Sequence, residues 1–126
     1  MKLTWLGHGS FRLDIEDQVL LIDPWFTGNP EFPEGSRDDA TAGAPHLLIT
    51  HGHGDHASDA LALTRETGAP LVGIYDLMSH WEATENATTI GFNKGGTVML
   101  GDVAVSMVAA VHSSSMDSES GPQYAG

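Results

Sequence analysis

The chain has 126 residues, which suffices for one domain with a modest core, and its apolar content of 40% is that of a globular protein. Five basic residues against 17 acidic ones give a net charge of −12, which disfavours nucleic acid and anionic membranes as partners. Cysteine is absent, so the sequence excludes disulfides and thiolate ligands and leaves imidazole and carboxylate groups to bind any metal.

The first part of the chain is predicted to form strands followed by a long loop. Apolar or alternating runs predict strands at residues 2–5, 11–15 and 18–22, the last two joined by a tight hairpin at Glu16 and Asp17, as a small antiparallel sheet. Residues 24–44 are rich in glycine, proline and acidic residues and show no periodicity. A loop of this length is typical of a lid or a binding loop, and a passive insertion is the alternative.

The rest of the chain is predicted to alternate strands with two helices. The helices are expected at residues 57–68, where Gly68 is a stop signal, and at residues 76–84. The expected strands are residues 46–50, 70–75, 88–92, 97–100 and 103–111, the last pair joined by a turn at Gly101 and Asp102.

The densest chemical signal is the segment HGHGDH at residues 51–56, directly after the strand that ends at Thr50. Its two glycines allow backbone conformations that let the four polar side chains converge on a small volume. Three imidazoles and one carboxylate suit zinc, manganese or iron, and they are enough to begin two adjacent metal sites. An exposed turn with Asp55 as a helix cap would explain the aspartate but not the histidines.

Together with this segment, "WLGHGSFRL", "LLIDPWF" and "AAVHSSS" resemble the metallo-β-lactamase fold, and the chain is similar to the metal-dependent hydrolases related to L-ascorbate-6-phosphate lactonase. The resemblance implies an α/β protein with an αββα sandwich, of which residues 1–126 supply the N-terminal half. It also implies that His51, His53 and His112 hold a first metal, and that Asp55 and His56 are ligands of a second. The family's remaining ligands lie in a C-terminal half that this chain does not contain.

Two further residues are candidates for the site. The resemblance implies that Asp23 is a carboxylate that holds a ligating histidine or the metal loop, and an ordinary Asx-turn cap is the alternative. His8 lies between two glycines after the first strand and could reach the metal pocket as a substrate contact or proton donor; a plain turn histidine is the alternative. Asp55 and His8 are therefore the candidate catalytic residues, while His46 and His80 are expected to be structural.

The second metal site is predicted to be incomplete within the chain. Asp117 and Glu119 follow His112 and could supply the missing ligands, although the serines and glycine around them indicate a loop. Two helices are few for a sandwich that needs layers on both sides. We therefore expect an N-terminal half whose complement is missing, cleaved away or supplied by another chain.

The functional prediction is metal-assisted hydrolysis of a lactone, ester or phosphorylated small molecule with two divalent ions, zinc or manganese. A bound metal lowers the pKa of water from about 15.7 towards 7 and so makes hydroxide available at neutral pH. The alternatives are a redox di-iron protein, which usually has a glutamate where this chain has His53, a nuclease, which the charge argues against, and a non-catalytic metal-binding half-domain.

The expected partners are a small-molecule substrate and either a second copy of the chain or a complementing C-terminal half, without nucleic acid or membrane. The N-terminal residues lack the apolar segment of a signal peptide, and no apolar run reaches the ~18–20 residues of a membrane span. Together with the absence of cysteine, this predicts a cytoplasmic protein.

Overall fold

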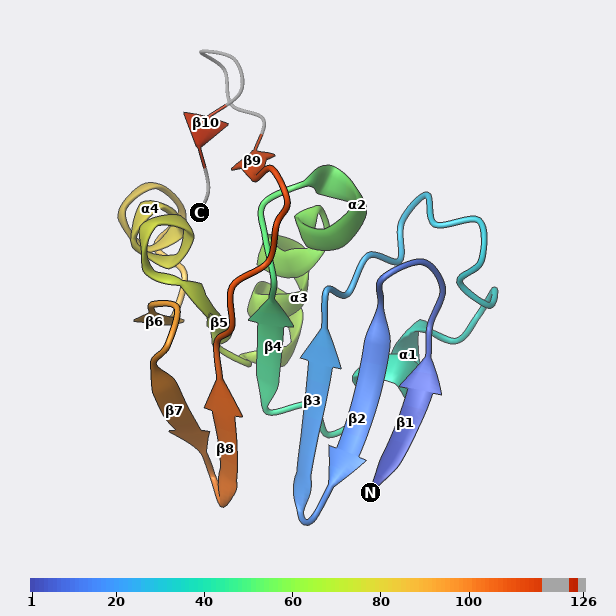
Figure 1. Cartoon of the computed structure of the whole chain (residues 1–126). Helices are drawn as coiled ribbons and strands as arrows, with labels where there is room; N and C mark the ends of the chain where they lie inside the picture. The colour runs from blue at the N-terminus through green and yellow to red at the C-terminus, as the bar shows by residue number, and fades with distance from the viewer. Residues whose placement is uncertain (117–122, 125–126) are drawn as a thin grey trace.

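The computed structural model describes residues 1–116 and 123–124, and its main element is a six-stranded mixed sheet (Figure 1). The strands lie in sequence order, and the first three are antiparallel as expected. Each later strand pairs in parallel with its predecessor, so the carboxyl ends of β3 to β6 meet at one edge. The strands are β1 (Lys2–Trp5), β2 (Phe11–Ile15), β3 (Gln18–Ile22), β4 (His46–Ile49), β5 (Leu71–Ile74) and β6 (Thr89–Phe92).

Four helices and four further strands complete the described part of the chain. The helices are α1 (Arg37–Thr41), α2 (Gly54–Ala57), α3 (Ala60–Thr67) and α4 (Tyr75–Glu85). The strands are β7 (Thr97–Leu100), which pairs with β8 (Val103–Ser106), and β9 (Ser115–Met116), which pairs with β10 (Gln123–Tyr124).

Three details differ from the sequence prediction. The loop at residues 24–44 contains a helix, α1, whose last carbonyls accept hydrogen bonds from the distant Arg12 guanidinium. The helix expected at residues 57–68 is α3 alone, and a separate short α2 precedes it. The strand expected at residues 103–111 ends at Ser106, because its partner β7 begins at Thr97, the residue paired with Ser106.

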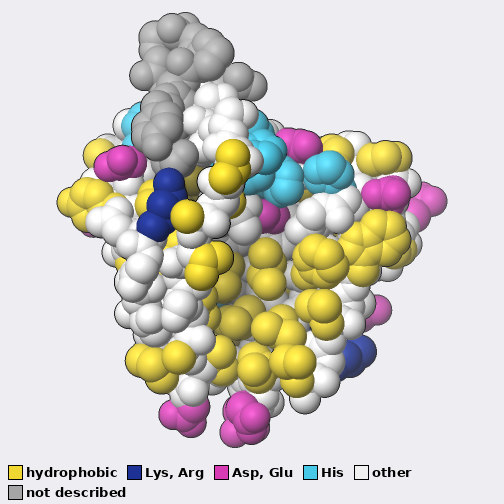
Figure 2. All heavy atoms as spheres, in the orientation of Figure 1, with side chains coloured by type: hydrophobic (Ala, Val, Ile, Leu, Met, Phe, Trp, Pro, Cys, Tyr) yellow, Lys and Arg dark blue, Asp and Glu magenta, His cyan; other side chains and the backbone are white. Residues whose placement is uncertain are grey.

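The two faces of the sheet bury different partners. On one face, α1, α3 and α4 pack their apolar residues, such as Leu63 and Leu77, against sheet residues that include Leu47 and Leu71. On the other face, the β7–β8 hairpin covers a smaller cluster around Leu20. Figure 2 shows hydrophobic side chains spread over the strands on the viewer's face, with the histidines gathered along the edge above them. Among the described helices, none combines the length and apolarity that crossing a membrane requires.

Candidate metal centre

The predicted site residues come from four separate segments that meet at the carboxyl edge of the parallel strands. The HGHGDH segment leaves β4 and runs into α2, while Asp23 follows β3. His8 lies in the turn between β1 and β2, and His112 lies on the segment that follows β8. The strand order of the main sheet therefore brings together His8, Asp23 and the HGHGDH segment, while His112 reaches them from the separate β7–β8 hairpin (Figure 1).

His51, His53 and His112 form a three-imidazole cluster at this edge. Each offers one ring nitrogen, and these nitrogens all lie within 4.8 Å of one another. The ring centroids of His51 and His53 are 4.7 Å apart, and those of His51 and His112 are also 4.7 Å apart. Three imidazoles at this spacing match the protein ligands of a zinc ion that keeps a fourth position open.

The Asp23 carboxylate holds the HGHGDH segment in place through hydrogen bonds. The residue is 3% exposed and has a left-handed backbone, with φ of 44°. Its carboxylate accepts hydrogen bonds from the Thr50 backbone N–H at 2.7 Å, from the Thr50 hydroxyl at 2.5 Å and from His56 Nδ1 at 2.9 Å. Thr50 and His56 lie 27 and 33 positions after Asp23 in the chain. The carboxylate therefore fixes the segment from Thr50 to His56 and does not cap its own turn.

These hydrogen bonds determine which ring nitrogens are free to bind a metal. The Thr50 hydroxyl donates its single proton to Asp23, so His51 Nδ1, 2.9 Å from that oxygen, must be the donor to Thr50. His51 Nε2 therefore carries a lone pair, and this buried atom has no hydrogen-bond partner among the described residues. A buried unpaired acceptor is costly, and a metal ion would satisfy it.

His56 and His112 are arranged in the same way. His56 Nδ1 donates to the Asp23 carboxylate, and His112 Nδ1 lies 2.6 Å from the Ser113 carbonyl oxygen, to which it donates. In each ring Nε2 is left as the potential ligand atom. Anchoring one imidazole nitrogen through a carboxylate or carbonyl so that the other can bind metal is the usual arrangement of histidine ligands.

The pKa shifts agree with this division of roles. Burial lowers the pKa of His51, and the nearby imidazole of His56 lowers it further, so the neutral ligand form is favoured. The hydrogen bond to Asp23 raises the pKa of His56, against the opposing effect of burial. Burial acts to raise the pKa of Asp55, but a hydrogen bond from its own backbone and the neighbouring His56 and His8 outweigh it, so the net shift is downward.

The raised pKa of His56 gives a pH dependence to the stability of the metal-free chain. Because the folded chain binds this proton more tightly than the unfolded one, the stabilisation is fully present below the ordinary value of 6.5 and is lost as the pH rises through the raised pKa. We expect the difference in unfolding free energy between wild type and His56→Ala, measured in urea with a chelator, to be larger at pH 5.5 than at pH 8.5. An NMR titration midpoint for His56 at or below 6.5 would contradict this account.

A second group joins the cluster on the side of α2. His8 Nε2 lies 3.0 Å from Asp55 Oδ2, and the ligand atoms of His8, Asp55 and His56 all lie within 4.8 Å of one another. The turn that carries His8 also touches His56 directly, because a Cβ added at Gly9 would lie 2.6 Å from His56 Cε1. Only glycine permits this approach of the β1–β2 turn to the metal loop.

Gly9→Ala is therefore expected to displace the His56 ring and to destabilise the fold by about 1–3 kcal/mol through overpacking. Gly54→Ala is the matched control, since a Cβ at Gly54 meets nothing within 4 Å. Urea unfolding of both variants measures the difference, and the His56 ring signal in NMR reports the displacement. Equal stability of the two variants would contradict the close contact.

Hydrogen bonds accepted by three further side chains near the site could not be predicted from the sequence. Buried Asp59 accepts hydrogen bonds from the backbone N–H groups of Phe26 and Thr27, each at 2.7 Å, which fastens the start of the 24–44 loop to the metal segment. Glu31 in that loop accepts a hydrogen bond from the His8 N–H at 2.9 Å. The Ser114 hydroxyl accepts one from the Gly52 N–H at 3.2 Å, across 62 positions. Of these three, only Asp59 could have been noticed in the sequence, because it is an acidic residue shortly after the HGHGDH segment. Nothing in the sequence indicated the groups that would donate hydrogen bonds to it.

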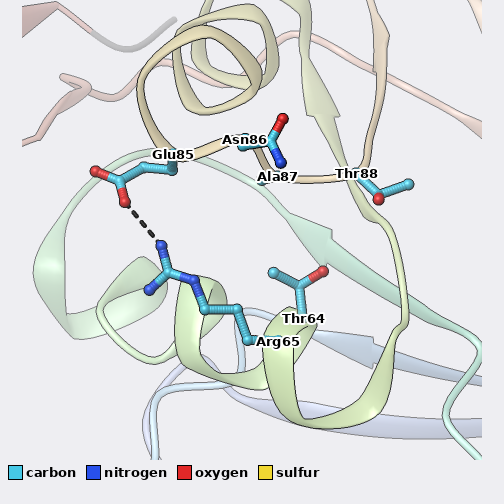
Figure 3. A pocket seen from close by; sticks show the side chains of 6 residues that line it. All are labelled: Thr64, Arg65, Glu85, Asn86, Ala87 and Thr88. Atoms are coloured by element: carbon cyan, nitrogen blue, oxygen red, sulfur yellow. Dashed lines mark hydrogen bonds and ion pairs between the residues drawn. The ribbon is translucent and has the colours of Figure 1, made fainter.

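The remaining candidates fall outside the cluster. His46 opens β4 and His80 lies on α4, and neither belongs to a group of potential ligands among the described residues. Asp117 and Glu119 lie outside the described residues. A polar pocket between α3 and the end of α4 contains no histidine, and the Arg65–Glu85 ion pair at 2.8 Å spans it (Figure 3).

Comparison with known proteins identifies the family of the chain. The family model described as the beta-lactamase superfamily domain matches residues 2–125. A protein of Dinoroseobacter shibae named a UPF0173 metal-dependent hydrolase is 71% identical over the whole chain, and one of Paracoccus denitrificans with the same name is 60% identical. In both cases the match covers 55% of the relative, so the chain spans about half the length of these curated relatives.

Solved structures confirm the expected fold class. Igni18, a metallo hydrolase from Ignicoccus hospitalis, superimposes with a TM-score of 0.76 at 31% identity over 89% of this chain and 49% of its own. BJP-1, a subclass B3 metallo-beta-lactamase of Bradyrhizobium japonicum, has a TM-score of 0.54 at 16% identity over 99% of this chain and 55% of its own. The α/β architecture is thus that of the metallo-β-lactamase fold.

Proposed function

The chain belongs to the beta-lactamase superfamily, and on that basis we propose that it carries the metal-binding part of a metal-dependent hydrolase. The observation that supports this most strongly is His51 Nε2, a buried lone pair without a partner among the described residues, which faces two further imidazoles. The relatives from Dinoroseobacter shibae and Paracoccus denitrificans, at 71% and 60% identity, are named metal-dependent hydrolases.

In this proposal His51, His53 and His112 hold a first divalent ion, and Asp55 and His56 contribute to a second. Nitrogen and oxygen donors without sulfur suit zinc or manganese. Such an ion supplies a Lewis acid and lowers the pKa of water at the site. Asp23 keeps the Thr50 end of the metal loop and the His56 ring in place through its three hydrogen bonds.

The proposed substrate is a lactone, an ester or a phosphorylated small molecule. Asp55 is 47% exposed and His8 is 43% exposed by side chain, so both face the solvent from which a substrate would arrive. As catalytic residues they would orient the substrate and move a proton at His8 Nε2. The net charge of −12 does not exclude an anion, because two divalent ions reverse the local field.

A redox di-iron function is the second candidate, since the fold also matches CmlA, a diiron beta-hydroxylase from Streptomyces venezuelae, with a TM-score of 0.58 at 22% identity over 85% of this chain and 23% of its own. That likeness concerns the fold alone. A histidine at position 53 and three clustered imidazoles favour the hydrolytic assignment, because iron sites of this kind are richer in carboxylates.

For the partner, we propose a complementing C-terminal half or, as the alternative, a second copy of the chain. Large apolar side chains on or beside the strands remain exposed, with Leu3 at 59%, Trp5 at 55% and Met99 at 62%. Figure 2 shows the extended apolar surface that the sheet presents. An apolar surface of this kind usually meets a protein partner, and the relatives are nearly twice as long as this chain.

The test is to assay the chain with zinc or manganese on a panel of lactones, esters and phosphodiesters, alone and after mixing with the separately made C-terminal half of the Dinoroseobacter relative. We expect weak hydrolysis by the chain alone and a large gain on mixing. A chain that binds metal but gains no hydrolytic activity with the complement would favour the non-catalytic metal-binding module.

A further inference from the structure

We propose that His8 is the third ligand of a second divalent-cation site that it forms with Asp55 and His56, so that this chain can hold two ions with its own residues. The inference rests on the proposed metal function and gives His8 Nε2 the role of a ligand from the β1–β2 turn in place of the proton-moving role described above. His51, His53 and His112 remain the ligands of the first ion.

The distances fit shared coordination. Two ligand atoms bonded to one zinc ion at about 2.0–2.2 Å lie roughly 3.0–3.5 Å apart. His8 Nε2 and Asp55 Oδ2 are 3.0 Å apart, and the His56 ligand atom lies within 4.8 Å of both.

Hydrogen bonds of the His8 backbone hold the residue in position. It has a left-handed conformation, with φ of 49°, which is uncommon for a residue with a side chain and persists only where contacts enforce it. Its N–H donates to the Glu31 carboxylate at 2.9 Å, and its carbonyl accepts a hydrogen bond from the Trp5 indole at 2.9 Å. The Trp25 ring lies edge-on to the imidazole at 5.4 Å.

The partner ligand His56 is prepared from the opposite side. Its Nδ1 donates to the Asp23 carboxylate, which leaves Nε2 as the ligand atom. Gly9, the residue after His8, gives the turn the close approach to the His56 ring that a Cβ would block. The rings of His8 and His56 consequently lie with centroids 5.1 Å apart.

The alternative is that His8 and Asp55 form only an ion pair at the surface. An ion pair between two side chains that are each more than 40% exposed contributes little to stability. It would not require the approach of the β1–β2 turn to His56, which brings the ligand atoms of His8, Asp55 and His56 within 4.8 Å of one another. The two accounts differ in how many cations the chain binds.

The experiment is a Zn²⁺ titration of the 126-residue chain, followed by native mass spectrometry and calorimetry. We expect two zinc ions on the wild type and one on His8→Ala, with His80→Ala as a matched control that keeps two. Two ions on both the wild type and His8→Ala would overturn the inference. One ion on the wild type, lost in His51→Ala/His53→Ala, would overturn the inference while the proposed function stands, and no bound zinc at all would overturn both.

A second measurement needs no variant and guards against a misfolded His8→Ala chain. The ¹⁵N signals of the His8 ring are followed in the wild type as zinc is added beyond one equivalent. We expect Nε2 of His8 to shift strongly during the second equivalent while the His80 signals stay in place. Unchanged His8 signals up to saturation would overturn the inference.

Discussion

Replacing His51 and His53 together with alanine is expected to abolish tight zinc binding at the first site, with a loss of affinity of roughly a thousandfold or more. The site loses two of its three imidazoles, and among the described residues His112 alone remains in this group of potential ligands. Calorimetric titration of zinc into the wild type and the double variant measures the effect.

His80→Ala is the matched control for this experiment, because it removes an imidazole that belongs to no group of potential ligands in the described part of the chain. Far-ultraviolet circular dichroism of each chain shows whether the fold survives. An unchanged affinity in a folded double variant would remove His51 and His53 from the metal site.

Asp23→Asn is expected to weaken zinc binding by about 10–100-fold although the residue is no ligand in the proposed first site. Asparagine keeps the shape of the side chain but replaces one acceptor oxygen with a donor, while Thr50 and His56 present three donors to this position. The buried mismatch should also lower the free energy of unfolding by about 2–4 kcal/mol.

Asp102→Asn is a suitable control for Asp23→Asn, since it makes the same chemical change at an exposed turn residue. Zinc titration and urea unfolding are compared for the two variants. If Asp23→Asn behaves like Asp102→Asn in both measurements, the Asp23 carboxylate does not organise the site.

Most elements of the fold could be predicted from local pattern. The alternating and apolar runs located β1 to β5 to within about a residue, because strand periodicity is a property of short segments. The structure differs from the prediction where a contact between distant residues determines where an element forms or ends. Arg12 satisfies the carbonyls at the end of α1, and the extent of β7 determines where β8 stops, and neither fact is visible in the residues concerned.

The candidate site was predictable in its members but not in its connections. Three histidines and an aspartate within six positions after a strand form a local pattern, so His51, His53 and Asp55 stood out. The expected special conformations of Gly52 and Gly54 are not seen, since neither glycine has a positive φ. The chain of hydrogen bonds in which His51 donates to Thr50 and Thr50 donates to Asp23 forms because β3 and β4 are neighbours in the sheet. In the same way the hydrogen bond from His8 to Glu31 depends on the course of a loop without periodicity, so no local rule could give it.

Zinc X-ray absorption of the chain with one equivalent of zinc tests most directly whether three imidazoles hold the first metal ion. We predict a first shell of nitrogen and oxygen atoms at about 2.0–2.1 Å with the multiple-scattering signature of three imidazoles. A spectrum with one imidazole or none in the wild type would contradict the account.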